Sequence, residues 1–130
     1  MGGRDPRSPA LGAGALIAIE GADRRIAVLL HRAFERGARC YVPAGALGQA
    51  WRRGPRQTRL GLLLEDPAVS VEPLDQELAK AAGELCGRRG TDDVIDASVA
   101  LTSRRTGSVV LTGDPDHLRR LDPRLDIVAI

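Results

Sequence analysis

Residues 109–116 of the chain read VVLTGDPD, an apolar run that ends at a Gly-Asp-Pro turn. Short apolar runs bounded by turn residues are typical of buried strands. Pro115 is favoured in the first turn of a helix, and Asp114 before it can cap that helix. The stretch therefore predicts a strand that leads directly into a helix, which is the unit from which parallel α/β proteins are built.

The same alternation of strand and helix patterns runs along the rest of the chain. Strands are predicted at residues 10–19 (a short strand that turns into a helix near Gly14), 39–42, 69–73, 108–112 and 125–130. Because parallel strands joined by helices are connected by right-handed crossovers, this order predicts a three-layer α/β/α sandwich. Its centre is a mostly parallel five-stranded sheet, in which the sequence leaves the strand order open.

The helices between these strands are bounded by glycine, proline and capping residues. The first of them is expected to end at Gly37. The next are expected from Pro43 to about Trp51 and from Pro55 through Leu64. Further helices are expected from Asp75 through Leu85, with an end at Gly87, from Thr91 or Asp92 to about Arg105, and after Pro115.

The length of 130 residues fits one domain, which we assign to residues 9–130 after a polar N-terminal tail at residues 1–8. The first ten residues, MGGRDPRSPA, lack the apolar stretch of a signal peptide. No apolar run approaches the roughly 20 residues that a membrane helix needs. Cys40 and Cys86 form no CxxC pair, so we expect both as small buried side chains of a cytoplasmic protein.

The composition limits the kinds of site that the chain can carry. Only three residues are aromatic, which argues against a protein that stacks single-stranded bases on aromatic side chains. His31 and His117 have no partner pattern, and both are expected at the surface. The net charge of +2 is too small to indicate a nucleic-acid partner by itself.

Four arginines lie close together in sequence after Trp51. Arginine forms a better fork for phosphate than lysine does, so these side chains could contact RNA phosphates. The alternative is a solvated helical face, because Pro55 interrupts the segment. The arginines are Arg52, Arg53, Arg56 and Arg59.

Two acidic clusters are predicted to meet at one edge of the sheet. Asp93 and Asp96 are three residues apart at the start of a helix, and Asp114 with Asp116 follows a strand. Ligands of open parallel sheets bind outside the carboxyl ends of the strands, which is where both clusters fall. Capping of helix N-termini explains each cluster alone. Their convergence favours a site for a hard divalent ion such as Mg²⁺.

The glycines of the first segment offer a weaker signal. Residues 11–18 read LGAGALIA, with the first two glycines of a dinucleotide-binding loop but Ile17 where the third belongs. A tight strand–helix turn is therefore the better interpretation of Gly12 and Gly14.

These three segments, in this order, resemble the PIN-domain family, especially the VapC-type toxins of bacterial toxin–antitoxin modules. LGAGALIA at residues 11–18 is similar to the family's opening motif LDAGALIA. DVIDAS at residues 93–98 is similar to its helical acidic motif, and LTGD at residues 111–114 to its strand-ending (S/T)xD motif. The resemblance spans nearly the whole chain, from Leu11 to Ile130.

The resemblance implies an endoribonuclease that cleaves RNA phosphodiesters with Mg²⁺ or Mn²⁺ held by four acidic side chains. Asp96 and Asp114 match family acidic positions, while Asp93 and Asp116 are additional candidate ligands. Thr112 is expected to orient a carboxylate or a water molecule from outside the ligand set.

Two acidic positions of the family carry other residues in this chain. The first aspartate falls on Gly12, and the central glutamate falls on Gln49. Glu20, at the end of the first motif, is a candidate for a contribution through water. Fewer carboxylates hold a metal ion less well, so activity is expected to be weakened or abolished.

The resemblance also implies three partners: an RNA substrate, a VapB-like antitoxin that lays a basic or apolar tail over the acidic edge, and a second copy of the chain. The dimer would use the apolar faces of the helices around residues 47–64. The alternative function is a catalytically inactive PIN-like module that binds RNA or protein. A phosphoacceptor receiver domain fits poorly, because Lys80 lies in the wrong element for it.

Overall fold

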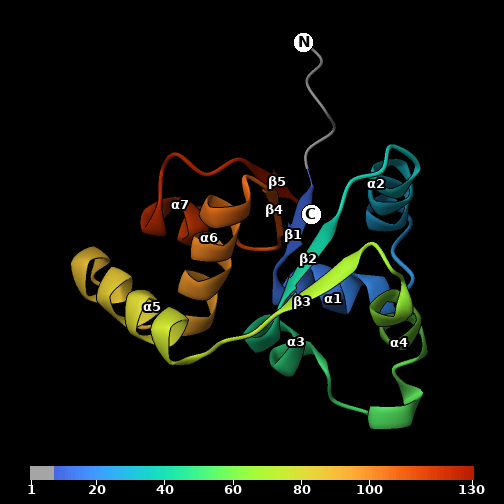
Figure 1. Ribbon diagram of the computed structural model, residues 1–130, viewed down its shortest axis with the longest axis horizontal. Coiled ribbons are helices and arrows are strands. Elements are labelled where there is room, and N and C mark those ends of the chain that lie inside the picture. Colours follow the sequence, from blue (N-terminus) through green and yellow to red (C-terminus); the bar gives the residue numbers. More distant parts are fainter. Residues whose placement is uncertain (1–7) are drawn as a thin grey trace.

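The computed structural model describes residues 8–130, which form one sheet with helices on both sides (Figure 1). The five strands are all parallel and lie in the order β3-β2-β1-β4-β5. This arrangement confirms the predicted α/β/α sandwich and supplies the missing strand order. The strands are β1 (Pro9–Leu11), β2 (Cys40–Pro43), β3 (Val69–Glu72), β4 (Val109–Thr112) and β5 (Ile127–Ala129).

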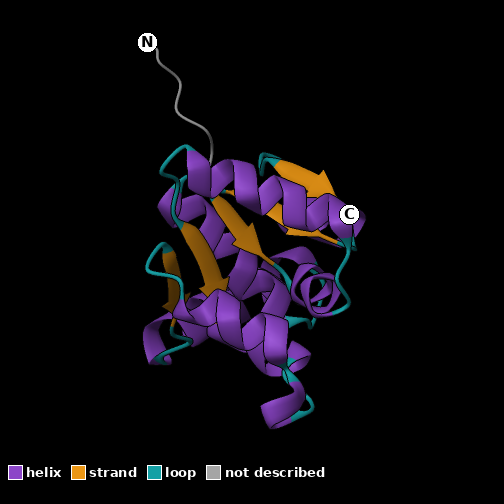
Figure 2. Cartoon of the chain, turned by 90° about the vertical axis from the view of Figure 1, so that its right-hand side faces the viewer, coloured by secondary structure: helices purple, strands orange, loops and turns teal. Residues whose placement is uncertain are grey.

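The helices form two layers around the sheet, with α5, α6 and α7 on the left of Figure 1 and α1, α2 and α4 on the right. In the view turned by 90°, helices cross in front of the strands (Figure 2). The helices are α1 (Ala13–Glu20), α2 (Arg24–Glu35), α3 (Ala44–Ala50), α4 (Thr58–Glu65), α5 (Gln76–Arg89), α6 (Val94–Thr106) and α7 (Pro115–Leu121), and a short 3₁₀ helix spans Gly54–Arg56.

The core is aliphatic, as the low aromatic content requires. Leu11, Val42 and Val110 of the three central strands are fully buried between the helical layers. Strands buried on both faces read as continuous apolar runs, which is why the sequence patterns of these strands were visible. Cys40 and Cys86 are both buried and unpaired, as expected. Burial raises the pKa of the Cys40 thiol to about 12, so this side chain acts as a small hydrophobe.

Several predicted boundaries are wrong by a few residues for physical reasons. The first strand ends at Leu11 and α1 begins at Ala13, one residue before the expected turn near Gly14. Gly87 lies inside α5, which continues to Arg89 because Gly90 (φ 67°) adopts the left-handed conformation that ends it. Pro55 opens only a 3₁₀ turn, and α4 starts at Thr58.

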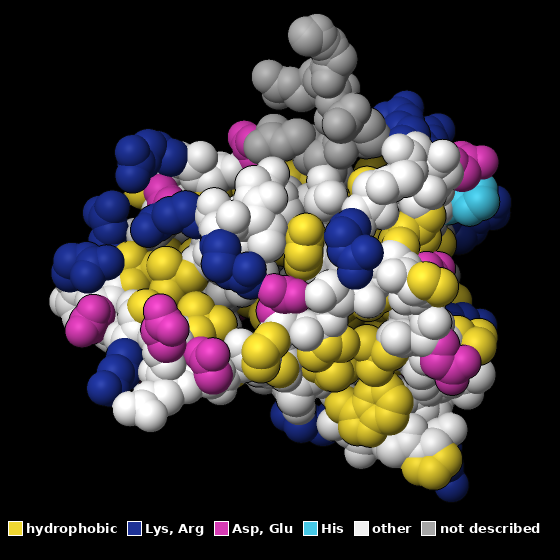
Figure 3. All heavy atoms as spheres, in the orientation of Figure 1, with side chains coloured by type: hydrophobic (Ala, Val, Ile, Leu, Met, Phe, Trp, Pro, Cys, Tyr) yellow, Lys and Arg dark blue, Asp and Glu magenta, His cyan; other side chains and the backbone are white. Residues whose placement is uncertain are grey.

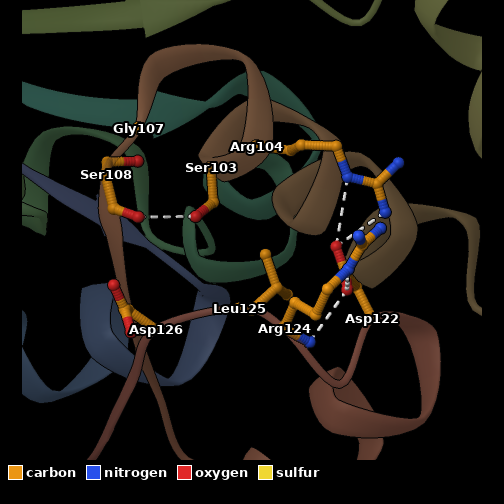
Figure 4. Close-up of a pocket in the computed structure, with 8 residues that line it drawn as sticks. All are labelled: Ser103, Arg104, Gly107, Ser108, Asp122, Arg124, Leu125 and Asp126. Atoms are coloured by element: carbon orange, nitrogen blue, oxygen red, sulfur yellow. Dashed lines mark hydrogen bonds and ion pairs between the residues drawn. The ribbon is translucent and has the colours of Figure 1, made fainter.

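A buried aspartate fixes the loop between α7 and β5, at the amino end of β5 (Figure 4). The Asp122 side chain is 5% exposed. Its Oδ2 accepts hydrogen bonds from Arg104 Nε and Nη2 at 3.1 and 2.7 Å, and its Oδ1 accepts one from the Arg124 backbone N–H at 2.9 Å. The loop that follows α7 is thereby tied to the C-terminal turn of α6.

The predicted N-terminal tail at residues 1–8 falls mostly outside the described residues, which begin at Ser8. Ser8 itself continues the pairing of the central strand β1 with β4, because its carbonyl accepts the Val109 N–H at 2.8 Å. Within residues 8–130, no helix is both long and apolar enough to cross a membrane.

Candidate metal centre

The candidate site lies where β1 and β4 end side by side. Leu11 and Leu111 are partners in the parallel register, and the Gly12 N–H donates to the Leu111 carbonyl at 3.1 Å. Gly12 and Thr112 are therefore neighbours at the carboxyl edge of the sheet. This edge is the place where parallel α/β proteins bind their ligands.

The first acidic pair lies at the start of α6. Asp93 is the N-cap residue, and its Oδ1 accepts the Asp96 backbone N–H at 2.9 Å. This contact satisfies one of the amide groups that the first turn of a helix leaves without a partner. It also brings the two carboxyl groups to the same helix end, so the capping and metal-binding interpretations of Asp93 are compatible.

The third acidic residue follows β4 and caps α7. Asp114 Oδ1 accepts the His117 backbone N–H at 3.2 Å. The Asp114 N–H donates to Thr112 Oγ1 at 2.9 Å, so the buried Thr112 hydroxyl fixes the turn that carries Asp114. The Thr112 side chain thus positions Asp114 by accepting a hydrogen bond from the Asp114 backbone N–H.

His117 connects the two helix ends, although no partner for it was predicted from the sequence. Its Nδ1 lies 2.7 Å from Asp96 Oδ2, and its Nε2 lies 2.9 Å from Thr91 Oγ1. The side chain is only 16% exposed, so the expectation of a surface histidine without a partner is wrong for His117. His31 does lie at the surface, at 3.3 Å from Glu35 on α2.

The resulting cluster has the chemistry of a divalent-ion site. One ligand atom each of Asp93, Asp96 and His117 can be chosen so that all three lie within 4.8 Å of one another. Burial raises the pKa of Asp96 above its ordinary value, the His117 hydrogen bond lowers it, and the charges of Asp93 and Asp114 raise it again. A half-buried carboxylate beside two others is unfavourable in the absence of a cation, and such perturbed groups concentrate at functional sites.

The group of three possible ligands includes none of the remaining predicted site residues. Gly12 is buried and has no side chain, and Gln49 is exposed on α3. Asp116 is 95% exposed and pairs with Arg119 at 3.5 Å. Glu20 Oε1 accepts the Leu60 N–H at 3.0 Å at the start of α4, and this hydrogen bond lowers the pKa of Glu20.

The predicted RNA-contacting arginines lie on the exposed loop that follows α3. Arg52, Arg53 and Arg56 are all exposed, as is Arg59 at the start of α4. The loop is shaped by the buried Gln57, whose Oε1 accepts the backbone N–H groups of Arg52 and Arg53 at 2.8 and 3.0 Å. Sequence reasoning missed this role because a single glutamine in a polar loop gives no signal of burial.

The fold and the cluster define a parallel α/β/α protein with an acidic site at the carboxyl edge of β1 and β4. Comparison with protein families matches residues 14–122 to the PIN domain. The chain belongs to the PIN domain family, as its three short motifs predicted.

A solved structure with a similar fold is the VapBC2 complex from Rickettsia felis bound to a DNA fragment from their promoter. The likeness covers 94% of this chain and 98% of that one, with a TM-score of 0.69 and 14% identity. At 14% identity the likeness shows a shared fold alone. Comparison with curated proteins gave no match.

Proposed function

We propose that this chain is a metal-dependent endoribonuclease of the VapC toxin type, whose activity is weakened by Gly12 and Gln49. The observation that carries the proposal is the convergence of Asp93, Asp96 and the Asp114–His117 turn at the carboxyl edge of a PIN domain. A bound Mg²⁺ or Mn²⁺ would supply Lewis acidity toward the scissile phosphate and lower the pKa of a bound water.

The residues of the chain prepare this chemistry by orientation. Asp96 presents its carboxylate from the first turn of α6, where His117 holds one oxygen. Asp93 accepts a backbone N–H through Oδ1, and a carboxylate has enough lone pairs to bind a cation as well. Thr112 keeps Asp114 at the end of β4. Asp93, Asp96 and Asp114 are the carboxylates that would hold the ion.

The alternative is a PIN-like module that binds RNA or protein without cleaving it. Two observations favour it: Gly12 leaves the end of β1 without a carboxylate, and Gln49 is neutral. Such a module would retain the exposed arginines of the loop after α3 as RNA contacts.

We expect metal binding to separate these proposals from simple helix capping. Mn²⁺ in hundredfold excess over its dissociation constant should stabilise the native chain by about 2.7 kcal/mol. Asp96→Asn and Asp114→Asn should each weaken Mn²⁺ binding in calorimetric titrations, because each removes a charged ligand. Glu84→Gln, on the exposed surface of α5, is the matched control and should leave binding unchanged. Unchanged affinity in both aspartate variants would contradict the site.

An antitoxin partner is proposed by analogy with the VapBC complex. The acidic edge displays Asp114 and Asp116 as exposed carboxylates, and this charge suits a basic tail. A tail that covered the edge would block access to Asp96 and so inhibit cleavage.

We also propose a homodimer through the helices around residues 47–64. Trp51 is 36% exposed and Leu62 is 64% exposed. Figure 3 shows hydrophobic side chains gathered at the lower right of this face, in the region of α3 and α4. Contiguous exposed apolar surface of this kind marks interaction sites.

Sedimentation at high protein concentration should therefore show a dimer. Leu62→Glu should shift it to monomer, because a buried, unpaired charge is unfavourable in an interface. Val28→Glu, at a 45% exposed apolar residue of α2, is the control and should leave the dimer intact. A strict monomer of the native chain would contradict the dimer.

A further inference from the structure

His117 lies at the acidic edge and offers a ring nitrogen as a possible metal ligand. The site there has fewer carboxylates than its family pattern. Its side chain is 16% exposed and that of Asp96 is 20% exposed, so both are ordered by packing yet open to an ion from solvent. We propose that His117 is a ligand of the metal centre, and that this chain therefore prefers Zn²⁺ or Co²⁺ to Mg²⁺. The inference rests on the proposed metal-dependent function and specifies which ion it uses.

The distances allow an ion to replace the proton between His117 and Asp96 with little movement of the two side chains. Two ligand atoms on a tetrahedral zinc ion lie roughly 3.3 Å apart, given metal–ligand distances near 2.0–2.1 Å. His117 Nδ1 and Asp96 Oδ2 are 2.7 Å apart, joined by a hydrogen bond. A small increase in the distance between these two atoms lets an ion take the place of the proton between them. Asp93 supplies the third ligand atom of the group.

Thr91 supplies the partner that a metal-bound imidazole needs. Ligating histidines usually donate their other ring N–H to a neighbouring acceptor, which fixes the orientation of the ring. His117 Nε2 lies 2.9 Å from Thr91 Oγ1. Because a hydroxyl both donates and accepts, Thr91 can donate to Nε2 when Nδ1 carries the proton and accept from Nε2 when Nδ1 binds the ion. Binding through Nδ1 of the neutral ring thus requires only a change of tautomer.

The donor set then determines the choice of ion. Mg²⁺ dehydrates reluctantly and is held through carboxylates and waters, whereas imidazole nitrogen suits zinc and the later transition metals. Gly12 and Gln49 each place an uncharged residue where the family pattern has an acid, which weakens the attraction for Mg²⁺. His117 adds a donor whose bond to Zn²⁺ or Co²⁺ does not depend on negative charge.

The test measures binding of metal ions to the whole chain by calorimetry. Zn²⁺, Co²⁺ and Mg²⁺ are titrated into the native chain and into His117→Asn, Asp96→Asn and His31→Asn. His31 is the matched control, because it is an exposed imidazole beside a carboxylate on α2. The visible absorption of bound Co²⁺ reports directly on its ligands. His117→Gln serves as a second variant, and thermal unfolding without metal checks that both variants fold.

We expect Zn²⁺ and Co²⁺ to bind the native chain at least 100-fold more tightly than Mg²⁺. His117→Asn and His117→Gln should weaken both by more than the roughly 10- to 100-fold that loss of an orienting partner costs. They should also alter the Co²⁺ spectrum, while Mg²⁺ affinity changes less than threefold. If both variants keep native Zn²⁺ affinity and spectrum while Asp96→Asn loses binding, the ligand role of His117 is overturned and the nuclease proposal stands. If none of the three ions binds the native chain, both proposals fail.

Discussion

The Gly12→Asp variant should cleave RNA in the presence of Mg²⁺ at least tenfold faster than the native chain. The substitution adds a carboxylate at the end of β1, beside Thr112 and the turn that carries Asp114. Since activation of a metal-bound water depends on a correctly held ion, a further acidic ligand should raise both Mg²⁺ affinity and the rate of cleavage.

The backbone at Gly12 accepts the new side chain without strain. Its φ of −73° and ψ of 171° are extended values that any residue adopts. A Cβ atom there would lie 3.4 Å from the Leu111 carbonyl oxygen and 4.0 Å from the Thr112 side chain, which are ordinary contacts. Gly12 also occupies the N-cap of α1, where aspartate is preferred to glycine by a few tenths of a kcal/mol. Repulsion from the neighbouring carboxylates opposes this gain, so we expect slightly lower stability without metal.

The experiment compares Mg²⁺-dependent cleavage of a structured RNA by the native chain and by Gly12→Asp. Asp96→Asn in the variant background should remove the gain. Gly83→Asp adds the same charge at an open, exposed position of α5 and should leave cleavage at the native rate. If the native chain already cleaves as fast as Gly12→Asp, the first acidic position is dispensable. If neither cleaves, the RNA- or protein-binding module becomes the better account.

The sequence predicted the layers of this fold because each central strand is an uninterrupted apolar run. It could not place the end of α5, because Gly87 and Gly90 are both residues that can end a helix. The decisive difference is the backbone conformation: Gly90 has φ of 67°, and Gly87 stays helical. Composition alone does not distinguish a glycine that a helix tolerates from one that ends it.

The candidate site was predictable only as far as a helix start or a strand end places its residues at one edge of the sheet. Asp93 and Asp96 share a helix start, and Asp114 follows a strand, so their common edge could be inferred from topology. His117 could not be placed, because its partner Asp96 lies 21 residues away and the contact depends on the angle between α6 and α7. One signal was available: His117 is the third residue after the Asp114 cap, a position that lies beside the capping carboxylate.

Asp122→Ala should lower the stability of the folded chain by about 2 kcal/mol at pH 7, because it removes charge-assisted hydrogen bonds to a buried carboxylate. For a domain of this size the melting temperature should fall by roughly 8 °C. The cost stays moderate because Arg104 and Arg124 are 45% and 87% exposed and can be solvated when their partner is removed. Asp116→Ala is the matched control, since that side chain is 95% exposed, and it should change stability by less than about 0.5 kcal/mol.

The dependence of this loss on pH identifies its cause. Burial raises the pKa of Asp122, but the Arg124 backbone N–H and the Arg104 guanidinium outweigh burial and hold the pKa below its ordinary value of 3.8. The folded state therefore binds the proton less tightly than the unfolded state, and the stabilisation is present above pH 3.8 and lost as the pH falls through the folded pKa. Urea unfolding of both chains at pH 7 and at progressively lower pH should show the difference shrinking in acid. A difference that stayed constant would mean that Asp122 acts through packing of the loop after α7 and not through its charge.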